Sequence, residues 1–235
     1  MKFTPTLAVA LSLLTSAALQ AQSGFTTDKT PSGGVIVKQD GKLFAEYIVD
    51  QANKPYLAPV FGPAGKQMTR NYPMKTIDGE THDHPHHRGI CFGHEEIGGI
   101  EFWAEKKTYD EMNAKKPGTG DVHLAKLGST KHRAYELVKA GQDGAVIDDI
   151  IDWLDPNGKK LLEEHRRMYF HAADGTWIID MDQDLIASEG AVRVEDRKDA
   201  GLSIRVPTSM AVDSKLGGKT SLSCDRHGEI PSLRS

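Results

Sequence analysis

Apolar and acidic side chains alternate with a period of two along residues 176–188. In an extended chain the two sets face opposite sides: Trp177, Ile179, Met181 and Leu185 against Asp180, Asp182 and Asp184. Such alternation predicts a half-buried β-strand. We interpret the aspartates as a solvated face, because antiparallel sheets commonly keep one face in water. A calcium site is the alternative, and no loop-type spacing of ligands favours it.

Short segments of the same kind recur along the chain between turn signals, such as the hairpin signal Asp40-Gly41 and the turn at 155–158. The segments that we expect to be strands are 35–37, 43–49, 88–94, 122–127, 134–140, 145–154, 161–171, 176–188, 201–206 and 210–212. Residues 106–120 are highly charged and predict an exposed excursion with one helical turn at 109–114. This pattern is typical of an all-β protein, and we expect an antiparallel β-sandwich.

The N-terminus has the pattern of an export signal. Lys2 precedes an apolar run at residues 7–14, and small residues follow up to Ala21. A membrane anchor is the alternative, but the apolar run is shorter than the ~20 residues that a span needs. We therefore expect a signal peptide at 1–21, a flexible leader at 22–34, a sandwich domain at 35–223 and an irregular tail at 224–235. The mature protein is predicted to be periplasmic or secreted, with no membrane segment after cleavage.

Composition narrows the choice of partners. The formal net charge of −4 excludes nucleic acid as the main partner, because there is no basic excess to neutralise phosphates. The chain has two cysteines, Cys91 and Cys224, which could pair in an oxidising compartment. Cys91 lies in an apolar run, so we expect it to be a small buried side chain.

The densest chemistry lies at residues 82–94, which hold five of the ten histidines together with Asp83 and Arg88. Imidazoles and carboxylates are common ligands for transition metals, and His84 and His86 share one face of an extended segment. One divalent transition metal bound by these two side chains is therefore a hypothesis. No His-Glu-x-x-His helix motif and no cupin-type glutamate accompany them.

Acid–base chemistry is the second interpretation of this stretch. A histidine would move a proton with a glutamate as its partner, and an arginine would stabilise a developing oxyanion. The candidate catalytic residues are His87, Arg88, His94 and Glu101. Trp103 lies two residues after Glu101, where an aromatic ring could carry the apolar face of a sugar. The third interpretation is structural, with the histidines capping backbone groups around Pro85.

Several blocks of the chain resemble a family of exported bacterial proteins that carries the label methane oxygenase PmoA. The blocks are Arg70 to Pro73, Asp83 to Gly89, Phe92 to His94, Gly98 to Glu105, Asp152 to Lys159, Glu163 to Arg167 and Gly201 to Met210. The resemblance implies a β-sandwich, similar to the large sandwich of sugar mutarotases, in which a histidine and an acid shuttle protons. It also implies that the sandwich is truncated, because family members continue past the point that corresponds to Ser223.

Together these patterns predict an exported protein that binds or processes a carbohydrate, either a sugar or a keto-sugar. The side chains expected to bind this small-molecule substrate are Arg70, Asn71, His84 and Trp103. One alternative is a metal-dependent enzyme such as an oxygenase, as the family label implies. Another is a non-catalytic carbohydrate-binding module.

Overall fold

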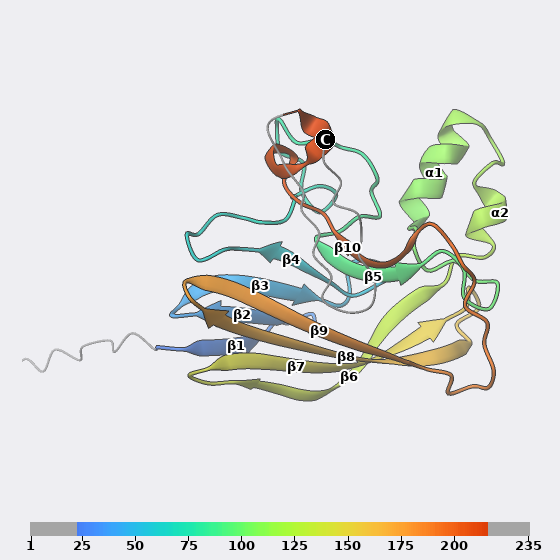
Figure 1. Ribbon diagram of the computed structural model, residues 1–235. Helices are drawn as coiled ribbons and strands as arrows, with labels where there is room; N and C mark the ends of the chain where they lie inside the picture. The colour runs from blue at the N-terminus through green and yellow to red at the C-terminus, as the bar shows by residue number, and fades with distance from the viewer. Residues whose placement is uncertain (1–22, 216–235) are drawn as a thin grey trace, which may run out of the picture.

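Two antiparallel sheets face each other in the computed structural model, which describes residues 23–215 (Figure 1). The first sheet has the strand order β1 (Phe25–Lys29), β2 (Val35–Gln39), β3 (Lys42–Ile48), β4 (Tyr56–Val60), β5 (Ile90–His94) and β10 (Ala200–Ile204). The second has the order β6 (Ser129–Ala140), β7 (Gly144–Leu154), β8 (Lys160–Ala173) and β9 (Thr176–Ile186). The expected all-β antiparallel sandwich is thus confirmed.

The main core lies between the sheets, because alternate residues of each strand point inward. On β7 the inward set includes Ile147, Ile151 and Trp153, which have no exposed surface. Phe44 of β3 meets the ring of Phe170 on β8 at 5.5 Å, edge to face. The alternation expected for 176–188 is present in β9, whose aspartates are exposed as predicted.

A buried polar network also crosses the core. Glu164 accepts hydrogen bonds from Arg166 Nε at 2.7 Å and from Trp153 Nε1 at 2.8 Å. Asp149 accepts one from the hydroxyl of Tyr47 at 2.7 Å. Burying an unpaired charge is costly, so these partners stabilise the charged groups in the core, and the hydrogen bond from Tyr47 of β3 to Asp149 of β7 connects the two sheets.

Three local expectations differ from the structure. Residues 22–34 are not a flexible leader throughout, since β1 pairs along its whole length with β2 and buries Phe25 against Phe44. The segment 122–127 is not a strand but contains the helix α2 (Asp121–Leu124), which follows Gly120. The expected strand at 210–212 is replaced by two 3-10 helices, η1 (Thr208–Met210) and η2 (Val212–Ser214).

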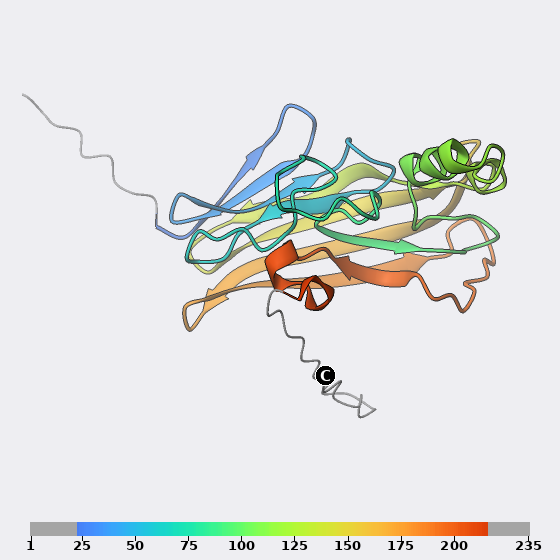
Figure 2. The same cartoon turned by 90° about the horizontal axis from the view of Figure 1, so that it is seen from above.

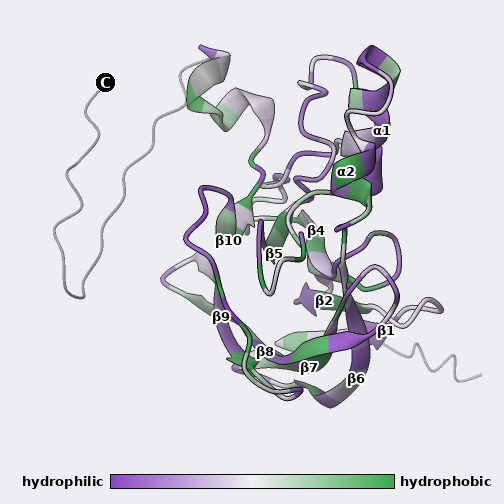
Figure 3. Ribbon diagram, turned by 90° about the vertical axis from the view of Figure 1, so that its right-hand side faces the viewer, coloured by the Kyte–Doolittle hydropathy of each residue, from purple (hydrophilic) through white to green (hydrophobic). Residues whose placement is uncertain are grey.

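The excursion at 106–120 is more helical than expected. It forms α1 (Lys106–Lys115), ten residues long, in which Tyr109 is the buried side chain. Most of α1 is hydrophilic in Figure 3, and both helices lie beside the first sheet rather than between the sheets (Figures 1 and 3). In the described part of the chain, no helix is long and apolar enough to cross a membrane. The predicted signal peptide and most of the predicted tail lie outside residues 23–215.

The loop from residue 61 to residue 89 returns to the first sheet beside β4, as Figure 2 shows from above. Gly89 closes this return with φ at +44°, and a Cβ there would lie 2.0 Å from the backbone oxygen of Leu57. Only glycine allows the two backbones to approach so closely. This contact places the histidines that precede Gly89 on the outer face of the first sheet.

Candidate functional site

Three histidine rings gather at the turn that begins at His84. The backbone N–H of His87 donates to the oxygen of His84 at 3.0 Å, and His84 has φ at +49°. The rings of His84 and His87 stack at 5.2 Å with 9° between their planes. His86 meets His87 edge to face, with ring centroids 4.4 Å apart. The local sequence therefore brings three imidazoles into contact.

Trp103 joins this group from the segment that precedes α1. Its ring meets the ring of His87 edge to face at 5.5 Å. Glu101 holds the backbone here, because its Oε1 accepts hydrogen bonds from the N–H groups of Trp103 at 2.6 Å and Ala104 at 2.9 Å. Its Oε2 accepts from the hydroxyl of Tyr109 at 3.1 Å. We define the histidine cluster as His84, His86, His87 and Trp103.

The imidazoles of His86 and His87 are held in the neutral form. Burial lowers the pKa of His86 to about 3, and the positive charges of neighbouring groups such as Lys54 add to this effect. Burial likewise lowers the pKa of His87 to about 4, with Arg205 the next contributor and Asp199 acting in the opposite direction. Both rings are therefore uncharged at neutral pH, and each carries one unprotonated nitrogen.

Among the described residues, His87 is the histidine of the cluster in which both ring nitrogens are unpaired. Within residues 23–215, neither of its ring nitrogens has a hydrogen-bond partner, and neither is closed off from solvent. The indole N–H of Trp103 likewise has no hydrogen-bond partner in this range and is open to solvent. By contrast, His86 is fixed by Thr108, whose hydroxyl oxygen lies 2.9 Å from Nδ1. The imidazole of His87, a partly desolvated base, thus lies beside Trp103, whose indole N–H is a hydrogen-bond donor.

Lys54 lies beneath the cluster and is only 2% exposed. Its ammonium group donates a hydrogen bond to the backbone oxygen of Trp103. Burial lowers the pKa of Lys54, and the charges of Cys91, Glu105 and Glu101 oppose that shift. The sequence showed no signal for this residue, which lies in an irregular segment beside Pro55.

Arg88 turns away from the cluster into a closed ion pair. Its Nε and Nη2 donate to the two carboxylate oxygens of Glu105 at 2.7 and 2.8 Å. The guanidinium also lies over the ring of Tyr56, 5.4 Å from its centroid. The expected role of Arg88 in gripping an oxyanion is thus replaced by a bidentate pair that anchors the start of α1.

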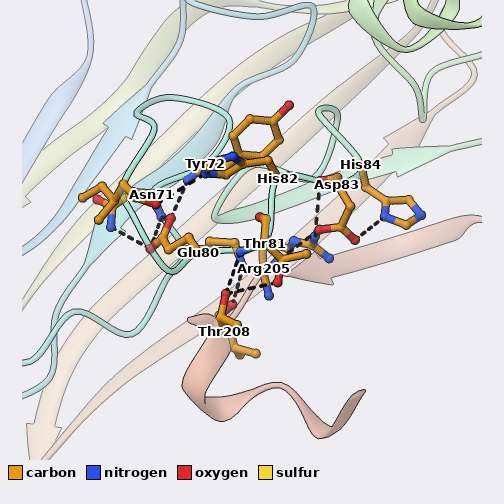
Figure 4. Close-up of polar contacts among 12 residues, drawn as sticks. Asn71, Tyr72, Glu80, Thr81, His82, Asp83, His84, Arg205 and Thr208 are labelled. Carbon is orange, nitrogen blue, oxygen red and sulfur yellow. Dashed lines mark hydrogen bonds and ion pairs between the residues drawn. The ribbon is translucent and has the colours of Figure 1, made fainter. Parts of the chain in front are cut away.

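The acid that contacts a histidine of the cluster is Asp83, which Figure 4 shows between His84 and Arg205. Its Oδ2 accepts a hydrogen bond from Nδ1 of His84 at 2.7 Å, so that ring presents its other nitrogen to solvent. Arg70 pairs with Oδ1 at 3.1 Å, and Arg205 contacts the same oxygen. Burial alone would raise the pKa of Asp83, but the hydrogen bond from His84 and the charge of Arg205 outweigh it and lower the pKa.

Arg70 and Asn71 lie at a neighbouring cavity rather than in the histidine cluster. This cavity of about 290 Å³ has Ile48, Ala58, Pro59 and Met74 among its lining residues, together with polar side chains. Asn71 donates to Glu80 at 2.8 Å (Figure 4). None of the histidines lines this cavity. The predicted substrate-binding set is therefore divided between two places that are joined by the pair of Arg70 and Asp83.

The expected pair between a histidine and Glu101 is not formed, because the hydrogen bonds of Glu101 go to Trp103, Ala104 and Tyr109. His94 is buried at the end of β5, where its Nδ1 accepts from the N–H of Glu96 at 3.0 Å. Of the four predicted catalytic side chains, only His87 lies in the cluster. Cys91 is buried, as expected, and Cys224 lies outside the described residues.

The side chains proposed as metal ligands do not make a metal site by themselves. His84 and His86 have ring centroids 5.9 Å apart at 76°, and one nitrogen of each ring already faces Asp83 or Thr108. Among residues 23–215, no group of three histidine, cysteine or acidic side chains is placed to hold a metal ion. The donor set therefore does not fit a resident transition metal.

Fold and site together define a class: an antiparallel β-sandwich with a cluster of neutral histidines on the outer face of one sheet. Residues 34–229 match the model of a family of unknown function, DUF6807, and the chain belongs to this family. No curated protein matches the chain. No solved structure matches it either.

Proposed function

We propose that this protein binds a small carbohydrate, a sugar or a keto-sugar, at the histidine cluster and moves a proton on it. The observation that carries the proposal is His87: a neutral, partly desolvated imidazole with both ring nitrogens open to a ligand. Titratable groups with strongly shifted pKa values on an accessible surface are candidates for acid–base chemistry. A structural histidine usually has its nitrogens paired.

The surroundings of His87 suit a polyol with one apolar face. Trp103 offers an aromatic edge and a free indole N–H, which can donate to a hydroxyl or carbonyl oxygen. The neutral His87 accepts a proton from a hydroxyl group, or from the carbon beside a carbonyl, and returns it to another atom of the same molecule. No electrons are gained or lost in this exchange. His84 is a positioning residue, since Asp83 fixes its ring and that ring stacks on His87.

Two other functions would use the same surface. A non-catalytic carbohydrate-binding module would bind a sugar through the cluster and its accessible hydrogen-bond donors and would not convert it. A metal-dependent oxygenase, as the label methane oxygenase PmoA implies, would need a third ligand beyond His84 and His86. The export pattern at residues 1–21 supports a periplasmic or secreted site of action.

The test is a panel of aldoses and keto-sugars given to the purified protein. Mutarotation is followed by polarimetry, and deuterium uptake beside the carbonyl is followed by proton NMR in heavy water. We expect the wild-type chain to accelerate one of these exchanges and His87→Gln to abolish the acceleration. His123→Gln is the matched control, because His123 is exposed and stacks on Tyr109 outside the cluster.

The outcomes separate the three functions. Turnover that survives in His87→Gln would remove His87 from the mechanism. Binding to the panel without any exchange would favour the binding module. Exchange or oxidation that appears only after a transition metal is added, and that is lost in His84→Ala/His86→Ala, would favour the metal-dependent enzyme.

A further inference from the structure

The cavity of about 290 Å³ beside Arg70 is lined by two strands of the first sheet and by the loop at residues 61–89. The sheet contributes Glu46 and Ile48 from β3 and Ala58 from β4. The loop contributes Arg70 and Lys75, among others. Pockets for drug-sized ligands start at about 300 Å³, so this cavity suits a small molecule.

Glu46 brings a negative charge that is not neutralised within residues 23–215. Its neighbours Ala45 and Tyr47 are buried in the main core, so Glu46 faces the opposite side of the sheet. Its carboxylate forms neither a hydrogen bond nor an ion pair in this part of the chain. Burial raises the pKa of Glu46, and no positive charge offsets that effect. The ammonium group of a ligand would supply the missing partner.

Arg70 brings the opposite charge from the loop, with a side chain that is only 4% exposed. Its Nε donates to the backbone oxygen of Val206 at 3.2 Å, and its Nη1 donates to Asp83 at 3.1 Å. Its Nη2 has no hydrogen-bond partner among the described residues, yet it is not closed off from solvent. Lys75 is exposed, and its ammonium group is likewise unpaired in residues 23–215. A carboxylate of a ligand can accept hydrogen bonds from both cations.

Glu80 fixes the part of the loop that carries these cations. Its carboxylate accepts hydrogen bonds from the backbone N–H groups of Asn71 and Tyr72, both at 3.1 Å (Figure 4). The N–H of Lys75 donates to the backbone oxygen of Asn71 at 2.9 Å. The wall of the cavity is therefore ordered before a ligand binds, which lowers the entropy cost of binding.

We propose that this cavity binds a free α-amino acid with an apolar side chain. The ammonium group of the ligand pairs with Glu46, and its carboxylate pairs with Arg70 and Lys75. Glu46 forms no ion pair with either cation, so the cavity holds two separated charges of opposite sign, as a zwitterion does. The apolar side chain of the ligand packs against Ile48 and its apolar neighbours in the lining, Ala58, Pro59 and Met74. A neutral sugar would leave both charges unpaired, and this inference does not rest on the function proposed for the histidine cluster.

Isothermal titration calorimetry with L-leucine and two analogues tests the two charges separately. Isocaproate lacks the ammonium group of leucine, and isoamylamine lacks its carboxylate. We expect leucine to bind the wild-type chain roughly tenfold or more tightly than either analogue, because each analogue loses hydrogen bonds between charged groups.

Two variants connect each charge of the ligand to a side chain. In Glu46→Gln the preference for leucine over isocaproate should disappear. In Lys75→Gln the preference for leucine over isoamylamine should fall several-fold, because Arg70 remains. Glu111→Gln is the matched control, since Glu111 is an exposed residue of α1, and it should keep both preferences. Both cavity variants should keep the wild-type urea midpoint, because neither side chain has a bonded partner in the described chain.

Three results would overturn the inference. The first is that leucine, methionine and valine all fail to bind at millimolar concentration. The second is that leucine and isocaproate bind the wild-type chain equally well. The third is that Glu46→Gln keeps the full preference for leucine over isocaproate. None of these results depends on whether a sugar reacts at the histidine cluster.

Discussion

The low pKa values of His86 and His87 predict a loss of stability in mild acid. Between pH 6.5 and about 4 the unfolded chain binds protons at these two positions and the folded chain does not. The free energy of unfolding therefore falls as the pH falls through this window. The loss begins near pH 6.5, where the unfolded chain starts to bind the protons, and is complete below about pH 3, where the folded chain binds them as well.

The size of the effect follows from the linkage relation. Lowering the pH from 7 to 5 costs about 1.9 kcal/mol for each histidine that stays neutral only in the folded chain. Two such histidines give roughly 4 kcal/mol, and solvent screening at the half-buried His87 reduces this to about 3 kcal/mol. The carboxyl groups of Asp83 and Glu163, whose pKa values are lowered, titrate below this window.

Urea unfolding at pH 7, 6 and 5, followed by the fluorescence of the three tryptophans, of which Trp153 is fully buried, measures this loss. We expect His86→Gln/His87→Gln to lose about 3 kcal/mol less than the wild-type chain between pH 7 and pH 5. His123→Gln keeps both cluster histidines and should follow the wild type. If the double variant and the wild type lose the same stability, then burial does not keep the two imidazoles neutral.

Two further changes test the packing on which the site rests. Gly89→Ala should destabilise the fold by about 3 kcal/mol or more in the same urea assay, because the new Cβ would meet the oxygen of Leu57 at 2.0 Å; a wild-type midpoint would contradict this. Glu164→Gln should cost about 3–5 kcal/mol, because it removes the carboxylate that Arg166 contacts in the core. The control is Lys106→Ala, which removes the exposed ion pair of Lys106 with Asp110 and should lower the free energy of unfolding by about 0.5 kcal/mol. Equal losses of stability in Glu164→Gln and Lys106→Ala would contradict the predicted importance of the buried pair.

Local patterns in the sequence predicted much of the sandwich. The period-two alternation of 176–188 and the turn signals at Asp40-Gly41 identified strands correctly, because those signals depend on neighbouring residues alone. The segment 25–29 escaped prediction, because its polar residues lie on an edge strand and only Phe25 enters the core. The apolar residues Val122 and Leu124 are two positions apart, which predicted a strand, but both lie in the single turn of helix α2.

The histidine cluster was predictable only in part, for the same reason. His84, His86 and His87 are close in sequence, so their contact follows from one turn. Lys54 and Arg205 reach the site from segments far away in the chain, and nothing in their own neighbourhoods indicates it. Pairing choices were also beyond the sequence: Arg88 had two acids within reach downstream, Glu101 and Glu105, and packing at the start of α1 selects Glu105.

Binding of a sugar at the histidine cluster is tested most directly by an NMR titration of the histidine and tryptophan ring signals with the same sugar panel at pH 7. We expect at least one sugar of the panel to shift the ring signals of His87 and Trp103 and to leave those of His123 and His132 in place. We also expect His87 to show the nitrogen shifts of a neutral imidazole. Shifts confined to other rings, or a protonated His87 at pH 7, would contradict these expectations.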